Sequence, residues 1–338
     1  MISPVGLSAP QTCAALRAGI TRFEELEGVI DRFGEPVIAS TIPPFTQNAI
    51  PTAHSSDVAI RACSEALSAL PREELARRPL IVSILTKEKD RPGNHFDTQG
   101  LPDSLPKALD LPPSTPLHFF AGGNAAGIDA LFYAHQRIAA DPNSIELILG
   151  IDSLLDIGTL GYLEKMNRLK APSQPRGLIP GEAAVALLLQ DAASSGVSSY
   201  CTIDGLGRAD EPKPVGTDEP CLGEGLTNAI SAALGTAGWT SDEVERVYCD
   251  LNGEVYRAHE WMLALCRTLG NPEVVHPADC IGDVGAAFAP LLIGMAAVAL
   301  HRGYARTDRV LVFCSSEFGA RGSVCISKSF HGRRHPWK

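Results

Sequence analysis

One short segment of the chain has the form of a reactive turn. Residues 117–131 read as a buried strand, a tight turn at Gly122 and Gly123, and the start of a helix. Such a turn places one residue at the helix N-terminus, where free backbone N–H groups stabilise a nucleophile or an anion. That residue is Asn124, and a carboxamide is not a useful nucleophile toward an acyl carbon at neutral pH. The turn favours acyl chemistry, whereas the residue that it presents opposes it.

A second polar segment follows one of the predicted strands. Residues 250–261 carry Glu254, Tyr256 and Arg257 in a strand-to-helix turn that is unusually rich in polar side chains. These groups could form the floor of a pocket. They could equally be an ordinary helix-entry network of caps and ion pairs. Both interpretations stay open at the level of sequence.

The overall charge limits the kinds of partner. The chain has 338 residues, of which 45% are hydrophobic and 20% charged, and a formal net charge of −10. This composition is that of an ordinary soluble globular protein. An acidic chain is poorly suited to bind nucleic acid or an anionic membrane as a general partner. We therefore expect no nucleic-acid partner and no membrane partner.

The nine cysteines are scattered along the chain without a CxxC pair. This pattern favours reduced thiols in a cytoplasmic protein over a disulfide framework or a zinc site, and we expect neither a metal nor a cofactor. The first residues lack the basic and apolar regions of a secretory signal. The longest apolar run, residues 286–300, contains Pro290 and is shorter than the roughly 20 residues of a membrane span. We interpret it as a buried core helix.

Short apolar runs alternate with alanine-rich amphipathic segments. The apolar runs predict buried strands at residues 80–85, 117–121, 145–151, 183–189, 246–251, 309–314 and 323–327. The amphipathic segments predict helices at residues 57–70, 125–140, 225–238, 258–269 and 284–302. This alternation predicts an α/β protein with parallel sheets that helices bury on both faces.

The chain also shows a hint of internal duplication. Residues 178–187 and residues 317–326 each pass through a glycine-rich turn into a predicted strand. The polar segment 191–223 would join the two halves. We therefore expect one structural domain built from residues 1–195 and residues 196–338.

The order and spacing of several segments resemble the thiolase superfamily, and within it the β-ketoacyl synthases. The segments that carry the resemblance are residues 4–7, 13–19, 57–67, 122–131, 150–154, 180–184, 276–287 and 318–322. The resemblance covers nearly the whole chain. It implies a thiolase-like fold, in which two pseudo-repeated βαβαβαββ halves form a layered α-β-α-β-α core, normally as a homodimer.

The resemblance also points to three reactive positions. Condensing members of the family use a cysteine that takes the acyl group and two histidines that assist decarboxylation and stabilise the enolate. The cysteine corresponds here to Asn124, and the histidines correspond to Asn252 and Asp283. Asn124 lacks a thiolate, Asn252 can still donate a hydrogen bond to a carbonyl oxygen, and an ionised Asp283 would repel an enolate. We therefore assign no catalytic residue and treat the three positions as degenerate.

Four residues are candidates for lining a ligand pocket. They are Gly123, Asn124, Glu254 and Arg321. By the resemblance, Arg321 replaces a small residue in the closing glycine-rich loop. We expect its guanidinium to pair with Asp283 or Glu254 and to fill the former active site.

These residues support a first hypothesis and leave alternatives open. The first is a non-condensing binding, assembly or accessory protein of the cytoplasm, which pairs with itself or with a related subunit. The chain is also similar to ketosynthase-like proteins that accompany bacterial type VI secretion effectors, so an effector is a possible partner. The alternative is an acyl-thioester-processing enzyme, either an acyltransferase or a malonyl decarboxylase, because decarboxylating relatives tolerate an amide at the position of Asn124. A third reading is a module that binds acyl-CoA or acyl carrier protein in a retained tunnel.

Overall fold

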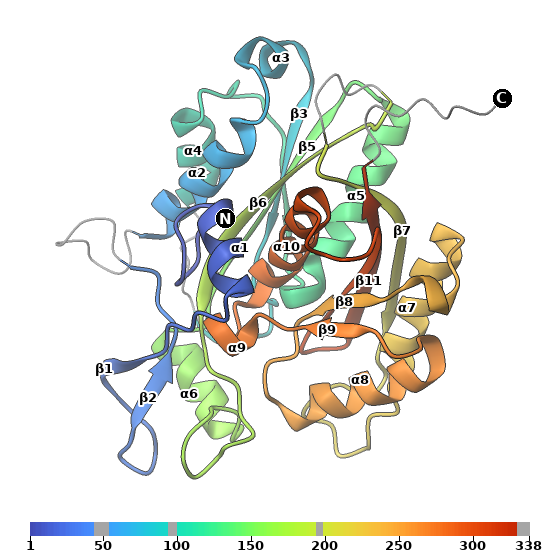
Figure 1. Ribbon diagram of the computed structural model, residues 1–338. Helices are drawn as coiled ribbons and strands as arrows, with labels where there is room; N and C mark the ends of the chain where they lie inside the picture. Colours follow the sequence, from blue (N-terminus) through green and yellow to red (C-terminus); the bar gives the residue numbers. More distant parts are fainter. Residues whose placement is uncertain (44–53, 94–99, 194–198, 330–338) are drawn as a thin grey trace.

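Two β-sheets enclose a central pair of helices, and further helices cover the outer face of each sheet (Figure 1). The computed structural model describes residues 1–43, 54–93, 100–193 and 199–329. The layers follow the order helix, sheet, helix, sheet, helix. This arrangement confirms the layered α/β architecture expected from the sequence.

The first sheet has the strand order β4-β3-β5-β6. Its strands are β3 (Leu80–Leu85), β4 (Leu117–Phe120), β5 (Ile145–Ser153) and β6 (Glu182–Gln190). The first three are parallel, and β6 runs antiparallel to β5. Every residue of β3 and β5 is buried because helices cover both faces, which explains their continuous apolar runs. The outer helices are α2 (His54–Leu67) and α4 (Leu101–Ala108).

The second sheet has the strand order β7-β11-β10-β8-β9. Its strands are β7 (Cys201–Asp210), β8 (Arg246–Cys249), β9 (Glu273–Val275), β10 (Arg309–Ser315) and β11 (Ala320–Lys328). β9, β8 and β10 are parallel, whereas β11 is antiparallel to both of its neighbours. The outer helices are α7 (Glu224–Ala237) and α8 (Val255–Thr268). The parallel strands that the alternation predicts are present in both sheets, and one antiparallel strand, β6 or β11, pairs with the last parallel strand of each.

The two sheets repeat one topology. The series β4-β3-β5-β6 matches β9-β8-β10-β11 in order and in strand direction. In the first sheet, Ile2 forms an antiparallel bridge to Ala184 of β6. It therefore occupies the position beside β6 that corresponds to the position of β7 beside β11 in the second sheet. The predicted pseudo-repeat is thus present in the fold. The boundary between residues 1–195 and 196–338 stays a prediction.

The central layer consists of α5 (Ala126–Ala140) and α10 (Phe288–Arg302), which pack against each other and against strands of both sheets. A 3-10 turn precedes each helix, η3 (Gly123–Ala125) before α5 and η5 (Gly285–Ala287) before α10. Residues 285–302 are long and apolar enough to cross a membrane, but 83% of this segment is buried inside the protein. The prediction of a core helix is confirmed, and its location between the sheets explains why it is apolar on all sides.

Two glycines allow α10 to lie unusually close to its neighbours. A β-carbon at Gly127 of α5 would overlap Ala289, and one at Gly150 of β5 would overlap Pro290. Pro290 lies in the first turn of α10, where a missing N–H costs little. The start of α10 therefore packs closely on α5 at Gly127 and on the backbone of β5 at Gly150.

The predicted linker between the halves contains a strand that the sequence pattern conceals. β7 falls within residues 191–223 and pairs with β11 along its whole length. A β-carbon at Gly205 or Gly207 would collide with the backbone of α7. The glycines that weaken the strand pattern are thus required where a helix lies directly on the strand. The linker prediction is wrong for this stretch.

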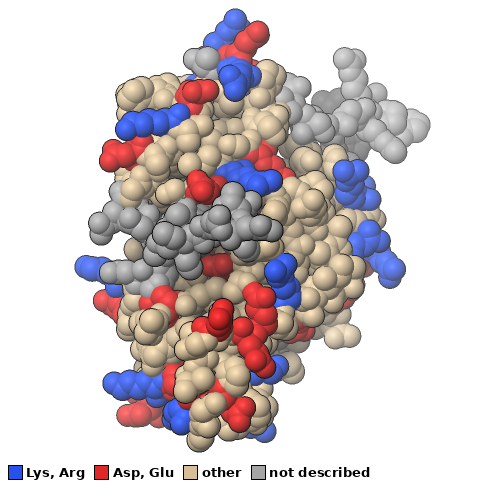
Figure 2. All heavy atoms as spheres, turned by 90° about the vertical axis from the view of Figure 1, so that its left-hand side faces the viewer, with Lys and Arg blue, Asp and Glu red and all other residues tan. Residues whose placement is uncertain are grey.

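The remaining described elements lie around this core. They are α1 (Ala9–Arg17), β1 (Glu24–Ile30), β2 (Pro36–Ala39), α3 (Arg72–Arg77), α6 (Ile157–Lys165), η4 (Ser241–Glu243) and α9 (Ala278–Ile281). The hairpin β1–β2 packs on α6 through a small apolar cluster that includes Val37, Leu160 and Leu163. Figure 2 shows the face on which this hairpin lies, and charged side chains of both signs are spread across it.

Candidate functional site

The glycine turn lies in the structure where the sequence predicts it, between β4 and α5. Gly123 has a φ of +60°, a left-handed conformation that favours glycine. Asn124 follows inside η3 and is only 4% exposed. Its Nδ2 donates a 3.1 Å hydrogen bond to Oδ2 of Asp250. The turn therefore presents Asn124 to another part of the chain.

Asp250, directly after β8, accepts this hydrogen bond and two more. Oδ2 accepts a 2.8 Å bond from Nη1 of Arg257 and a 2.9 Å bond from the N–H of Ser315. Burial raises the pKa of the Asp250 carboxyl, although Arg257 and these hydrogen bonds oppose the shift. Asp250 thus ties the turn before α5 to α8 and to the end of β10.

The other two predicted positions, Asn252 and Asp283, contact each other. Nδ2 of Asn252 donates to Oδ2 of Asp283 over 2.7 Å and to Oε2 of Glu254 over 3.0 Å. Oδ1 of Asp283 accepts a 2.9 Å bond from the N–H of Gly285. All three side chains are buried. Through Glu254 and Arg257 the structure links Asn252 and Asp283 to Asp250, and hence to Asn124.

Glu254 is held chiefly by an arginine that the sequence reasoning did not single out. Arg168 donates to the Glu254 carboxylate through Nε at 2.6 Å and through Nη2 at 3.0 Å. Burial pushes the pKa of Glu254 upward, but Arg168, together with Arg257 and Asn252, more than offsets it, so the pKa is lowered. Nη1 of Arg168 also binds Oε1 of Glu317 at 2.5 Å. The local signal for Arg168 is only that it immediately precedes the proline-rich segment 169–180.

Arg321 is buried beside this network, but its partner is not the one that the sequence predicts. The residue is 2% exposed, and its Nε donates a 2.7 Å hydrogen bond to Oε1 of Glu260 on α8. It also donates to the backbone oxygen of Ser316 and to the hydroxyl of Tyr256. The predicted pairing with Asp283 or Glu254 is wrong. Glu254 is already bonded to Arg168, whereas Glu260 faces β11 from farther along α8.

Two side chains, Ser316 and Glu88, accept hydrogen bonds from backbone N–H groups around the glycine turn. Oγ of Ser316 accepts a 2.8 Å bond from the N–H of Ala125 and donates to the backbone oxygen of Gly122. Oε1 of Glu88 accepts a 3.0 Å bond from the N–H of Glu317. Both donors would otherwise be free to bind a carbonyl oxygen.

Little free volume is left beside this network. A cavity of about 10 Å³ lies between Arg168, Glu254, Arg257 and Arg321 and residues 315–317. A volume of that size holds roughly one water molecule. An acyl chain does not fit there in this conformation.

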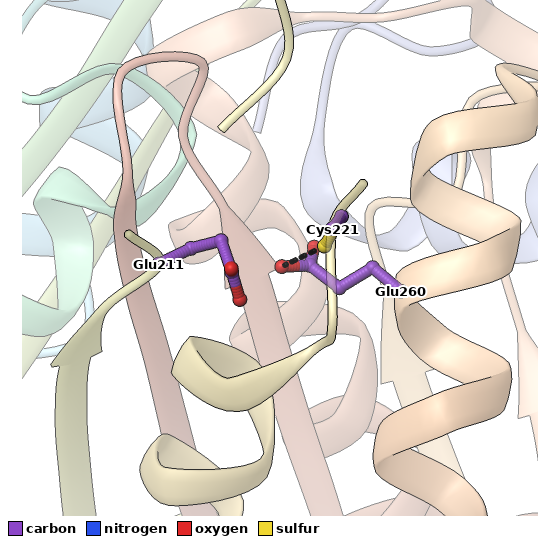
Figure 3. A group of neighbouring side chains, drawn as sticks. All are labelled: Glu211, Cys221 and Glu260. Atoms are coloured by element: carbon purple, nitrogen blue, oxygen red, sulfur yellow. Dashed lines mark hydrogen bonds between the residues drawn. The ribbon is translucent and has the colours of Figure 1, made fainter. Parts of the chain in front are cut away.

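A nearby group of side chains has the composition of a metal site, but its carboxylate oxygens already have partners within the protein. Ligand atoms of Glu211, Cys221 and Glu260 lie within 4.8 Å of one another (Figure 3). However, Glu211 accepts hydrogen bonds from the N–H groups of Lys213 and Gly225, and Glu260 is paired with Arg321. The Glu211 carboxylate at the start of α7 therefore acts as a helix cap, and the group does not fit a metal ion.

The cysteines nearest the network are poor nucleophile candidates. Burial raises the pKa of the Cys249 and Cys314 thiols well above the usual range. Burial also raises the pKa of Cys221, with the Tyr256 hydroxyl opposing it. None of the three supplies a thiolate at neutral pH.

Comparison with solved structures identifies the architecture. The ishigamide ketosynthase/chain length factor superposes with a TM-score of 0.80 over 97% of both chains, at 16% sequence identity. A β-ketoacyl synthase from Burkholderia phymatum gives a TM-score of 0.77 at 16% identity, also over 97% of both chains. The chain has the ketosynthase fold. A ketosynthase in complex with its chain length factor from Xenorhabdus doucetiae gives 0.75 at 14% identity, over 97% of this chain and 96% of the other.

No family sequence model and no curated protein sequence matches the chain. The likeness to ketosynthases is therefore one of fold, carried by topology over almost the whole length. It supports the thiolase-like architecture that the sequence motifs indicate.

Proposed function

We propose that this chain is a catalytically degenerate β-ketoacyl synthase-like protein, which does not condense acyl groups and acts as a binding, assembly or accessory subunit. One observation carries the proposal. Asn124, Asn252 and Asp283 are bonded into a buried network of carboxylates and guanidiniums, and the adjacent cavity has a volume of only about 10 Å³.

Acyl transfer at such a turn needs a nucleophile, space for the acyl chain and free donors for the carbonyl oxygen. Asn124 supplies no nucleophile. The cavity has room for roughly one water molecule. The N–H groups of Ala125 and Glu317 are bonded to Ser316 and Glu88. The absence of a nucleophile, the small cavity and the two bonded N–H donors all support a chain that does not condense acyl groups.

The fold and one exposed strand support a protein partner. Solved structures with this fold include a ketosynthase in complex with its chain length factor and another in complex with an acyl-carrier protein. β4 is the outermost strand of its sheet, and Phe119 on it is 47% exposed. A free strand edge with an exposed aromatic side chain favours pairing with another chain. We propose a homodimer or a pair with a related subunit.

Two further parts of the proposal rest on the sequence. The nine dispersed cysteines, all free, suit a cytoplasmic protein. The similarity to ketosynthase-like proteins that accompany type VI secretion effectors makes an effector a second class of partner. Acyl carrier protein and acyl-CoA remain ligand classes to test beside it.

The deciding experiment follows thioester loss by mass spectrometry. The purified protein is incubated with malonyl and acyl thioesters of coenzyme A and of acyl carrier protein, next to buffer alone and to Asn124→Ala. We expect no turnover above buffer for either protein. Turnover by the wild type that disappears in Asn124→Ala would overturn the proposal and favour the alternative, an acyltransferase or malonyl decarboxylase that uses Asn124.

A further inference from the structure

One dipeptide of the buried network carries a chemistry of its own. Asn252 is followed by Gly253, and this is the one Asn-Gly pair in the sequence. The main-chain nitrogen after an asparagine can attack the side-chain amide carbon, and glycine permits this most readily because it has no side chain to obstruct the approach. Gly253 is exposed, with a φ of +96°, whereas Asn252 is only 7% exposed. The reactive pair thus lies at the boundary between solvent and the network.

The reaction converts an amide into an acid. The Gly253 nitrogen forms a bond to Cγ of Asn252, the bond from Cγ to Nδ2 breaks, and Nδ2 leaves as ammonia with the proton that the Gly253 nitrogen gives up. Water then opens either carbonyl of the resulting five-membered imide, so residue 252 becomes aspartate or isoaspartate. One water molecule is consumed and one ammonia is released, and no other reactant is needed.

Three hydrogen bonds restrain the Asn252 amide in the folded chain. Nδ2 donates to Asp283 over 2.7 Å and to Glu254 over 3.0 Å, and Oδ1 accepts a 3.1 Å bond from the N–H of Glu254. Because Nδ2 is the leaving group, both of its bonds are lost when the imide forms. Hydrogen bonds to carboxylates are among the stronger ones in proteins, so the closed network opposes the reaction.

The product does not fit the place of the amide. An aspartate at residue 252 would bring a third carboxylate against Asp283 and Glu254, where the structure has two N–H donors. Like charges so close together are unfavourable in buried surroundings. An isoaspartate would also lengthen the main chain between β8 and α8 by one carbon atom. Either product prevents the original bonds from forming again.

We propose that Asn252 is a deamidation site that the closed network protects, and that its conversion is an irreversible switch which keeps the turn between β8 and α8 from closing again. The rate of conversion then reports how often this turn opens, because only the open form reacts. This inference goes beyond the proposed function, since it holds whether or not thioesters are turned over.

The first test follows deamidation of the full chain by mass spectrometry of peptides, in mildly alkaline buffer with and without urea. The internal control is Asn143, which is exposed and followed by Ser144. In urea Asn252 should react faster than Asn143, because glycine follows it. In native buffer the order should reverse, because only Asn252 is held by the network. Asn252 that fails to react in urea, or that reacts equally fast without it, would overturn the proposal.

The second test opens the network at one contact. Asp283→Ala removes the 2.7 Å acceptor of Nδ2, so native conversion of Asn252 should become at least about tenfold faster, with Asn143 unchanged. The control Arg208→Ala removes an exposed ion pair and should change neither rate. Should Asp283→Ala not fold, urea concentrations below the unfolding midpoint of the wild type replace it, and the rate at Asn252 should rise with urea. A rate that does not respond contradicts the proposal.

The third test examines the product itself. Asn252→Asp should lower the Tm by roughly 2 °C or more. Asn143→Asp makes the same chemical change at an exposed position and should shift the Tm by less than about 1 °C. Equal values for the two variants would show that an acid at residue 252 is accommodated, and the switch would be refuted.

Discussion

The side-chain amide of Asn252 donates a 2.7 Å hydrogen bond to the carboxylate of Asp283, 31 residues away in sequence. The second oxygen of Asp283 accepts the N–H of Gly285 in the turn before α10. A carboxylate with two such bonds near a helix N-terminus is stabilised in place. The pair therefore joins the β8–α8 turn to the central helix layer, and neither group is free to meet a substrate.

Restoring a cysteine at the glycine turn should not restore reactivity. In Asn124→Cys the thiol lies beside the buried Asp250 carboxylate, which raises the thiol pKa. We expect no acyl adduct at residue 124 after incubation with acyl thioesters, and alkylation at least about tenfold slower than at Cys266. Mass spectrometry of peptides measures both, and the exposed Cys266 shows that the reagent is active. An acyl group found on residue 124 contradicts this expectation.

The ion pairs of the filled site should contribute far more to stability than those of the surface. Arg168→Ala leaves the buried carboxylates of Glu254 and Glu317 without their guanidinium, which costs roughly 3–5 kcal/mol. Arg208→Ala removes an exposed partner of Asp129 and should cost less than about 1 kcal/mol. Urea unfolding of both variants gives the comparison. Equal losses would show that the buried network is not what holds this region together.

The elements that the sequence predicts well are those whose environment is uniform. β3 and β5 are buried on both faces, so an unbroken apolar run identifies them without knowledge of their neighbours. β7 is the opposite case. Its Gly205 and Gly207 become interpretable only when α7 is known to lie on them.

In the candidate site, too, some residues can be found from the sequence, whereas their partners require knowledge of the fold. The family resemblance singled out Asn124, Asn252 and Asp283 in the sequence, and the structure links all three through one buried network. The ion pairs of this region could not be found in that way, since Arg168 meets Glu254 across 86 residues and Arg321 meets Glu260 across 61. No local pattern encodes a pairing at that separation, and several acidic residues compete for each arginine.

One buried carboxylate should make the protein less stable as the pH rises toward neutrality. Glu146 lies in β5 with no hydrogen bond to either oxygen, and burial raises its pKa from 4.5 to about 7, with Arg137 opposing. Between these values the folded state binds more protons than the unfolded state. Stability is therefore highest below pH 4.5 for this group and falls as the pH rises through about 7.

Replacing Glu146 tests this pH dependence. Glu146→Met has a similar volume and no charge, so it should raise the free energy of unfolding at pH 8 by about 1–3 kcal/mol. At pH 5 the gain should be much smaller, because the glutamic acid is already neutral there. Glu146→Gln should abolish the pH dependence without the full gain. A pH profile of Tm for the three proteins decides, and an unchanged slope in Glu146→Met would refute the assignment.

The edge strand β4 gives the final prediction, on assembly. Among the strands that the structure describes, β4 is the outermost of its sheet, and its Phe119 is 47% exposed. Phe119→Lys should therefore leave the fold intact but place a desolvated charge in any strand-to-strand interface. We expect dissociation to become at least about tenfold easier. Ile157→Lys is the control, because Ile157 is 85% exposed on α6, outside the sheet edge. Analytical ultracentrifugation measures both. A homodimer that survives Phe119→Lys but not Ile157→Lys would contradict the prediction and place the interface at α6. A monomeric wild type would rule out the homodimer and leave a related subunit as the proposed partner of β4.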